Sequence, residues 1–563
     1  MRAELPGWMR SRAGAAPILL VAPHGGISPR DLLEPPAGGS ARSNDLYTAD
    51  VAAALAERLD ASLLANVALD RNQIDLNRLS EVERAAPWFL HAIGEHVERL
   101  LALHDQIEIV FVHGWHIVQP KCDIGLGRSL ATPQAAAAAA RALTVPARYV
   151  DDRLEPLRAL CRAAGIAAAY GERWPAAHAN NVMQVFRQTS TRAFAGVAGA
   201  LAAWARAGRI AATQLELGAP IRWPGRMRDA FVDAFVSACG GESGGVATPS
   251  GGHGPSGRAA DAASSGGSLA SLGARTVQGH DPDAGASGLG IAAAIGPMPD
   301  GRLGARLLFF PGGRRLVLFT GEERVPEGRR VGGLTIDDRA GGLALRFRGP
   351  ALLAPDASRH FRSEVEQARA RVVDVRADLQ LDTSAGHEFG PLAGAVEIDG
   401  ARFDVATHGF TTPALARATP PSDGSSTRVT ASFGRDLGLA LTVRSPGGAV
   451  EGQRFAGGER AEVRARPADG AAVATAASDA SAPFVVRLGG EALACRPACH
   501  LAWLRPLAGG RWARVTFGVA SFALADRGGG SGLYEHVVPV PCAARAEEGT
   551  AAAAAGEEDE DAP

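Results

Sequence analysis

Short apolar runs alternate with longer, alanine-rich stretches along the first 240 residues. The short runs predict β-strands near residues 17–22, 62–68, 107–113, 147–150 and 211–217. The alanine-rich stretches predict helices near residues 46–59, 81–104, 133–145, 153–165 and 191–207. Strands that alternate with helices indicate a mainly parallel sheet with helices on both faces. We therefore expect an α/β domain over residues 1–238.

The pattern changes again beyond this domain. Residues 239–290 are rich in Gly, Ser, Ala and Pro, and they contain too little apolar surface to offset their conformational entropy, so we expect a flexible linker. Residues 291–545 contain short apolar segments such as RLLFF, LALRF and VEIDGARFDV, separated by Gly, Pro and Asp turns. This spacing predicts an all-β domain, either a barrel or a sandwich. The acidic residues 546–563 are typical of a disordered tail.

Length and composition limit the function classes. A chain of 563 residues is too long for one ordinary core, which agrees with a multidomain protein. The net charge of −2 produces no global attraction to nucleic acid. No apolar stretch reaches the roughly 18–20 residues that span a bilayer, and the amino terminus lacks the pattern of a cleaved signal. Six scattered cysteines fit reduced thiols, so we expect a cytoplasmic protein without a membrane span.

Two histidines follow apolar runs in the first domain. His24 stands in the segment PHGG after the run that ends at Ala22, and His113 ends the run IEIVFV and precedes Gly114. Open α/β sheets bind ligands at the carboxyl ends of their strands, and imidazole is a common ligand of zinc. Two such histidines can share one metal ion. Each of them, taken singly, also fits a loop residue or a hydrogen-bonded core residue.

A cationic segment and an isolated carboxylate add to this chemistry. The pair Asn77-Arg78 follows Asp75, and a guanidinium beside an amide is suited to binding a carboxylate. The alternative is an Asp75–Arg78 ion pair on a surface loop. Glu216 lies between two leucines in QLELG, so it points away from them and can act as a general base. Its alternative is a solvent-facing residue on an edge strand.

The order of these motifs resembles the N-formylglutamate amidohydrolase family. The match consists of PHGG, Asp45 before a predicted helix, Arg71 with DLNR, HG followed by DIGLG, and ELG. It covers roughly residues 15–235. The resemblance implies the hydrolase-like α/β fold that is shared with zinc carboxypeptidases and the aspartoacylase group.

The resemblance also implies roles for individual residues. His24, His113 and Asp45 are expected to bind Zn²⁺ or another divalent transition metal. Glu216 is expected to be the general base, and Arg71 is expected to contact the carbonyl oxygen of the substrate. Asn77 and Arg78 are expected to bind the carboxylate of a small-molecule substrate.

The sequence departs from the family pattern at two positions. Carboxypeptidase-like sites use His-x-x-Glu, but the residue three after His24 is Ile27, so the acidic ligand must come from elsewhere. The family usually has Asp two residues before its second histidine, where this chain has Phe111. Loss of that acid weakens the expected support of the metal site. His116, three residues after His113, is an alternative ligand of lower rank.

The second half resembles a paired lipocalin-like barrel family related to carotenoid hydratases. The segments that carry this resemblance are residues 395–400, His408-Gly409 and residues 532–536. It implies a barrel that can enclose an apolar ligand. Three hypotheses follow: a metal-dependent amidohydrolase acting on an N-formyl or N-acyl amino acid, a degenerate α/β domain fused to a ligand-binding β domain, or two enzymes that catalyse successive steps.

Overall fold

The structure is a computed structural model. It describes residues 5–34, 42–128, 143–189, 192–240, 275–280, 289–298, 300–324, 329–383, 388–411, 425–433, 437–445, 449–456, 459–465, 483–488, 491–507, 511–524 and 528–540.

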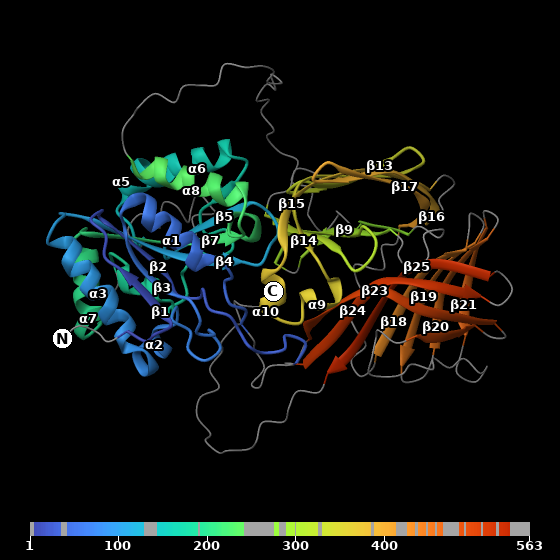
Figure 1. The fold of residues 1–563 in the computed structure, drawn as a ribbon, viewed down its shortest axis with the longest axis horizontal. Coiled ribbons are helices and arrows are strands. Elements are labelled where there is room, and N and C mark those ends of the chain that lie inside the picture. The colour runs from blue at the N-terminus through green and yellow to red at the C-terminus, as the bar shows by residue number, and fades with distance from the viewer. Residues whose placement is uncertain are drawn as a thin grey trace, which may run out of the picture.

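The amino-terminal part is a three-layer α/β structure (Figure 1). Its seven strands lie in the order β1-β3-β2-β4-β7-β5-β6, in which β3, β2, β4 and β7 are parallel and β1 and β5 run antiparallel to their neighbours β3 and β7. The strands are β1 (Met9–Arg12), β2 (Ile18–Ala22), β3 (Ser62–Asn66), β4 (Ile107–Trp115), β5 (Lys121–Gly125), β6 (Ala167–Ala169) and β7 (Ile210–Gly218). The main helices are α1 (Thr48–Leu59), α2 (Leu79–Ala85), α3 (Pro87–Leu101), α6 (Glu155–Ala163), α7 (Gly196–Arg206) and α8 (Arg226–Cys239). The expected α/β architecture is confirmed, with a mixed sheet.

Two apolar cores cover the two faces of this sheet. In β2, Leu20 and its alternate neighbours pack with α1, α6 and α8. Leu19 and Val21 point to the other face and pack with α2, α3 and α7 (Figure 1). A strand that is buried on both faces reads as a continuous apolar run, which is why the sequence pattern located β2, β4 and β7 well.

Two predicted elements differ in the structure. The helix expected at 81–104 is divided into α2 and α3, because Pro87 lacks an amide hydrogen and therefore begins a new helix. The strand expected at 147–150 is wrong: Ala147–Tyr149 form the short helix α5, which continues into the π-helical turn Val150–Leu154. Four residues are too few to separate a strand period from a helix period. Most of the helix expected at 133–145 lies outside the described residues.

A β-barrel follows the α/β part (Figure 1). Antiparallel pairing joins ten strands, and the pairing of β11 with β14 closes eight of them into a ring, with the β12–β13 hairpin attached to β14. The turn between β16 and β17 is Asp399-Gly400, and both residues have positive φ, which suits a two-residue hairpin. The strands are β8 (Arg275–His280), β9 (Gly290–Pro297), β10 (Leu303–Phe310), β11 (Leu316–Glu323), β12 (Arg330–Val331), β13 (Leu334–Arg339), β14 (Gly342–Ala354), β15 (Arg371–Asp382), β16 (Phe389–Ile398) and β17 (Ala401–Phe410). Two short helices connect β14 to β15, namely α9 (Ala357–His360) and α10 (Glu364–Ala368).

The third part is an eight-stranded antiparallel sheet in the order β21-β20-β19-β18-β25-β24-β23-β22. Its strands are β18 (Ser425–Phe433), β19 (Leu437–Ser445), β20 (Ala449–Ala456), β21 (Glu459–Ala465), β22 (Phe484–Leu488), β23 (Glu491–Leu507), β24 (Arg511–Leu524) and β25 (Gly528–Val540). The all-β second half is therefore confirmed, as two sheets. One strand begins earlier than expected: β8 lies within the predicted linker, where it pairs with β9 and β17. The rest of that linker beyond 240, apart from residues 289 and 290, and the acidic tail lie outside the described residues.

One apolar cluster joins the three sheets. The barrel contributes outward-facing residues of β10 and β11, while its inward-facing residues fill the interior. The α/β part contributes Leu46, Val118 and Trp223 to this cluster. The barrel contributes Leu308, Phe310 and Leu318, and the third sheet contributes Phe517 and Val519. Val118 follows β4 and Trp223 follows β7, so the carboxyl ends of the central parallel strands face the β part. No helix in the described portion of the chain has both the length and the apolar character needed to cross a membrane.

We expect Leu20→Ala to lower the free energy of unfolding by about 2–5 kcal/mol, because it leaves a cavity in the apolar core between β2 and the helices α1, α6 and α8. Urea-induced unfolding of the full chain, followed by tryptophan fluorescence, measures this change. Leu103→Ala is the matched control: this leucine is 63% exposed, and its truncation should cost about 0.5 kcal/mol or less. Equal effects of the two changes would contradict the assignment of β2 to the core.

Candidate active site and metal cluster

The site lies where the central parallel strands end. His24 follows β2, and His113 lies near the end of β4. Strand register places Glu216 of β7 directly beside His113, and Asp123 of β5 beside Glu216 on the other side. The side chains of directly paired residues share one face of a sheet. Three ionisable groups from neighbouring strands therefore lie in one row.

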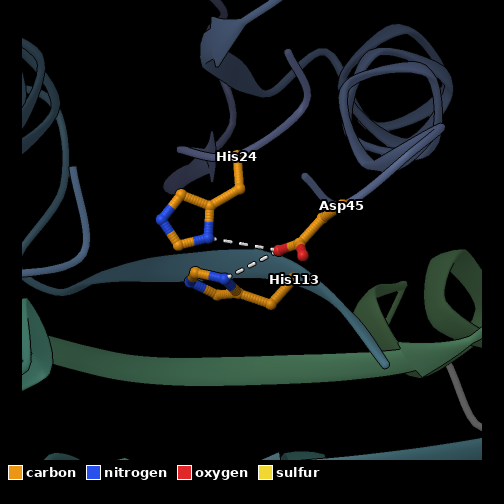
Figure 2. A group of neighbouring side chains, drawn as sticks. All are labelled: His24, Asp45 and His113. Carbon is orange, nitrogen blue, oxygen red and sulfur yellow. Dashed lines mark hydrogen bonds and ion pairs between the residues drawn. The ribbon is translucent and has the colours of Figure 1, made fainter. Parts of the chain in front are cut away.

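Asp45 lies to one side of the two histidines and contacts both of them (Figure 2). Its Oδ2 atom is 3.3 Å from Nδ1 of His24 and 3.1 Å from Nδ1 of His113. The three side chains are each at most 2% exposed, and their ligand atoms all lie within 4.8 Å of one another. The structure thus brings together three residues of which the outer two, His24 and His113, are 89 positions apart in the sequence.

A second buried carboxylate supports this cluster. Nε2 of His24 is hydrogen-bonded to Oδ1 of Asp75 at 2.7 Å. The other oxygen of Asp75 accepts hydrogen bonds from Arg42 at 3.0 Å and from Arg71 at 3.1 Å. A carboxylate that binds the second ring nitrogen of a histidine fixes its tautomer and orientation, as is common for metal-binding histidines. Asp75 therefore orients His24 with its Nδ1 toward Asp45.

These contacts determine the charge state of the cluster. Burial opposes ionisation of Asp45, but hydrogen bonds with His113 and His24 outweigh it and hold the pKa of this carboxyl well below its usual range. Burial likewise disfavours the Asp75 anion, and the charges of His24 and Arg71 reverse this and lower its pKa. Burial lowers the pKa of His113, whereas in His24 the two carboxylates overcome burial and raise the pKa. Without a metal, the cluster therefore contains two carboxylate anions.

Glu216 is buried beside this cluster at 7% exposure. Gln214, two residues earlier on the same face of β7, donates from Nε2 to Oε1 of Glu216 at 2.9 Å. Burial and the negative charge of Asp45 raise the pKa of Glu216 well above its usual range. β7 lies between β4 and β5, so the interpretation of Glu216 as a solvent-facing edge residue is wrong.

Arg222 lies next to Gly114 and is fully buried. It donates to the carbonyl oxygen of Leu46 at 2.8 Å and to that of Trp115 at 3.0 Å, so it joins the segment after Asp45 to the end of β4. Burial lowers the pKa of Arg222 to about 10, with the carboxylates of Asp45 and Glu216 acting in the opposite direction. A Cβ atom at Gly114 would lie 2.2 Å from Nη1 of Arg222, which explains the glycine after His113.

The glycines after His24 have a similar steric reason. A Cβ atom at Gly26 would lie 1.9 Å from the carbonyl oxygen of Leu69, so the two backbones can approach only because no side chain is present. This approach brings the segment after β2 against the segment that leads to Arg71 and Asp75. The motif PHGG therefore brings His24 within reach of Asp75.

The predicted substrate contacts lie at the edge of the cluster. Arg71 donates to the carbonyl oxygen of Ser43 and to Asp75, and its guanidinium is 3.8 Å from Asp45. Arg78 is the N-cap residue before α2, and its side chain is 31% exposed and 3.8 Å from Asp75. Oδ1 of Asn77 is buried and has no hydrogen-bond partner among the described residues. The Asp75–Arg78 pair is therefore present, but Asp75 is buried and does not lie on a surface loop.

His116 and the cysteines of the described residues do not join the site. His116 has an exposed side chain, and the metal-type cluster of the described residues does not include it. Cys122 belongs to the apolar core on the sheet face opposite Glu216, and burial raises the pKa of its thiol. Cys495 and Cys499 pack in two different apolar clusters. The five cysteines in the described part of the chain are free thiols.

The donor set of the cluster fits a divalent metal ion. Two imidazole nitrogens and one carboxylate oxygen are ligands that zinc accepts, and three protein ligands leave a further coordination position open. The open position is the feature that separates catalytic from structural zinc sites. The Asp75–His24 bond adds the outer support that such ligands usually have. His24, Asp45 and His113 are therefore the residues that can hold a metal.

Comparisons with known proteins find similar solved structures, among them an amidohydrolase and a hydratase. Neither the scan against family models nor the search of curated proteins finds a match. An N-formylglutamate amidohydrolase from Ralstonia eutropha JMP134 is 13% identical with a TM-score of 0.27, over 41% of this chain and 94% of that one. A kievitone hydratase from Nectria haematococca is 10% identical with a TM-score of 0.29, over 47% of this chain and 89% of that one. Both resemblances expected from the sequence are confirmed in this sense, at a similarity too low to indicate an activity.

Three site residues were not recognised from the sequence. From the sequence, Asp75 is expected only as a partner of Arg78, although an acid beside a short apolar segment and two arginines suggests a buried ion pair. Arg222 gave a clearer signal, because it stands alone between Ile221 and Trp223 just after a buried strand. Gln214 shares the face of Glu216 by strand alternation and could have been inferred from it.

We expect Asp75→Asn to lower the free energy of unfolding by about 3–5 kcal/mol, because it leaves Arg42 and Arg71 without their buried anion. Chemical unfolding of the metal-free chain measures the loss. Asp233→Asn is the control: it removes the 64% exposed partner of Arg58, and such surface pairs contribute about 0–1 kcal/mol. A change at Asp75 no larger than that at Asp233 would contradict the proposed charge network.

Proposed function

We propose that the protein is a zinc-dependent amidohydrolase that cleaves the amide of an N-formyl or N-acyl amino acid or a similar small carboxylate. The observation that carries this proposal is the buried cluster of His24, Asp45 and His113, with Glu216 in register beside it. Three side chains that can bind zinc and a neighbouring carboxylate that can act as a base together match the requirements of metal-assisted hydrolysis. The class of substrate comes from the resemblance of the sequence motifs.

The chain's own residues divide the work of this reaction. A bound zinc ion supplies a Lewis acid that makes water a stronger acid at neutral pH. Glu216 takes the proton of the attacking water and later returns a proton to the leaving nitrogen. Gln214 holds one oxygen of this carboxylate, which fixes its direction. Because Glu216 is buried and close to Asp45, its affinity for a proton is higher than that of an exposed glutamate, which favours uptake of the proton from water.

Cations at the rim of the cluster are suited to the substrate. Arg71 lies 3.8 Å from Asp45, close enough to the metal ligands to stabilise negative charge on the carbonyl oxygen. Asn77 and Arg78 follow Asp75 closely in the chain, and Arg78 is partly exposed, so this pair is suited to bind the carboxylate of an incoming substrate.

The alternative is a catalytically degenerate α/β domain whose β part binds an apolar ligand. In the described part of the barrel, the interior is filled by the chain's own apolar side chains, such as Phe309, Phe319 and Phe347. The cluster in the α/β part is intact, since Asp45 supplies the acidic ligand that Ile27 does not, and Asp75 supports His24. These observations favour the hydrolase, and the apolar ligand stays a prediction.

We expect about one zinc ion per chain, as for a catalytic site with three protein ligands. His113→Ala should lose the metal, because it removes a ligand that nothing else in the cluster replaces. Elemental mass spectrometry of the purified protein after reconstitution with Zn²⁺, Mn²⁺ or Co²⁺ measures this content. His104→Ala is the control, since His104 is only partly buried and, among the described residues, its side chain bonds to the carbonyl oxygen of Ala15. A wild-type protein that binds no metal would refute the proposal.

We expect Glu216→Gln to lower kcat for an N-acyl amino acid by about 10²–10⁴-fold, because an amide cannot accept the proton of water. The metal content should be retained. Release of the free amino acid, measured with N-formyl and N-acetyl amino acids, gives the rate. Glu57→Gln, an exposed change on α1, should leave the rate unaltered. A Glu216→Gln variant with full activity would exclude this carboxylate as the base.

A further inference from the structure

Glu364, a residue of the β part, is hydrogen-bonded to the segment that carries Asp45. Glu364 is the first residue of α10, whose N-cap Ser363 accepts a hydrogen bond from the amide of Glu366. The helix lies between β14 and β15 of the barrel. Glu364 is fully buried although it belongs to a short surface connection, so its carboxylate must find partners inside the protein.

Those partners all come from the α/β part. Oε1 of Glu364 accepts from the backbone amide of Asn44 at 2.7 Å. Oε2 accepts from the backbone amide of Ser28 at 2.7 Å and from Nδ2 of Asn44 at 3.1 Å. Ser28 follows the PHGG motif, and Asn44 immediately precedes Asp45. One carboxylate therefore joins the segment after His24 to the segment before Asp45.

Asn44 is also hydrogen-bonded to the segment that carries Arg71. Its Oδ1 accepts from the backbone amide of Arg71 at 2.9 Å, and its Nδ2 also donates to Asp70 at 3.1 Å. The next amide, that of Asp45, donates to the carbonyl oxygen of His24 at 2.8 Å. Movement of Asn44 would thus displace Asp45 and Arg71 together.

Further contacts hold α10 against the same segment. The hydroxyl of Tyr47 donates to the carbonyl oxygen of Ala368 at 2.7 Å, and the amide of Leu32 donates to that of Arg362 at 2.8 Å. These bonds and the apolar junction keep the two parts together, so Glu364 does not have to do so. Its own hydrogen bonds are directed at the two segments that flank the metal cluster.

We propose that Glu364, 320 residues away from Asn44 in the sequence, is a positioning residue that completes the metal cluster by fixing Asn44 and, through it, Asp45 and Arg71. This inference rests on the proposed function, since it assigns the β part a role at the same site. The β part is then a component of the active site and not an independent module.

Glu364→Gln is the decisive substitution because it preserves size but not hydrogen bonding. Both carboxylate oxygens face N–H donors, so the amide nitrogen of glutamine must oppose one of them. We expect the affinity for Zn²⁺ to fall about tenfold or more, as for other residues that orient metal ligands. Competition with a chromophoric chelator, using the full chain, measures the dissociation constant. The melting temperature of the metal-free protein, measured in parallel, reports any general loss of stability.

Glu366→Gln is the matched control on the same helix, because Glu366 pairs with Arg369 of the β part. It should leave the zinc affinity unchanged. Glu364→Asp keeps the charge but shortens the reach by one methylene, and it serves as a milder variant if Glu364→Gln does not fold. A zinc affinity of the Glu364 variants equal to that of wild type would overturn the inference.

Hydrogen exchange separates failure of this inference from failure of the proposed function. If the wild-type protein binds no metal, the proposed function fails, and the exchange rates of the Asp45 and Arg71 amides decide the role of Glu364. Faster exchange at these two amides in Glu364→Gln, but not in Glu366→Gln, would support positioning. Unchanged rates would overturn it.

Discussion

The carboxylate of Asp45, in contact with two buried histidines, is the constraint on which the rest of the site depends. A buried anion is stable only with close partners, so His24 and His113 must both approach within 3.3 Å. His24 then needs Asp75 on its other nitrogen, and Asp75 in turn needs arginine. Each buried ionised group needs a partner of opposite charge or a hydrogen-bond partner. Residues from four separate segments therefore come together at the carboxyl ends of β2 and β4.

The packing of the three parts follows from the same requirement. The segments after β2, β4 and β7 carry the site, and their backbone groups need partners once they are buried. The barrel supplies several of these partners: Thr320 accepts from the amide of Val118 at 2.9 Å, and Glu364 accepts from the segment before Asp45. Without the barrel, these loops would lose hydrogen bonds, and Trp223 would lose its apolar neighbours. The site is therefore stabilised from the side of the β part.

Much of this arrangement could be predicted from local sequence, and the reasons are physical. Continuous apolar runs identified β2, β4 and β7 because these strands are buried on both faces, and the residues at their ends became the candidate ligands. The period was ambiguous at 147–150, where four residues form a helix. Long-range contacts left no local pattern: nothing around Glu364 indicates that its partners are Ser28 and Asn44. The roles of Asn77 and Arg78 stay predictions, because a substrate determines them.

The departures from the family pattern therefore do not argue for a lost activity. A metal site requires donor atoms at suitable distances, and sequence spacing is only one way to provide them. Ile27 cannot supply the acid, but Asp45 lies within hydrogen-bond distance of both histidines. The backbone of its loop is hydrogen-bonded to Arg222 and to Glu364. Phe111 cannot support a histidine, but it packs in the apolar core while Asp75 bonds to His24. Acidic groups from distant segments of the chain bond to both ring nitrogens of His24, which makes the geometry of the cluster dependent on the whole fold.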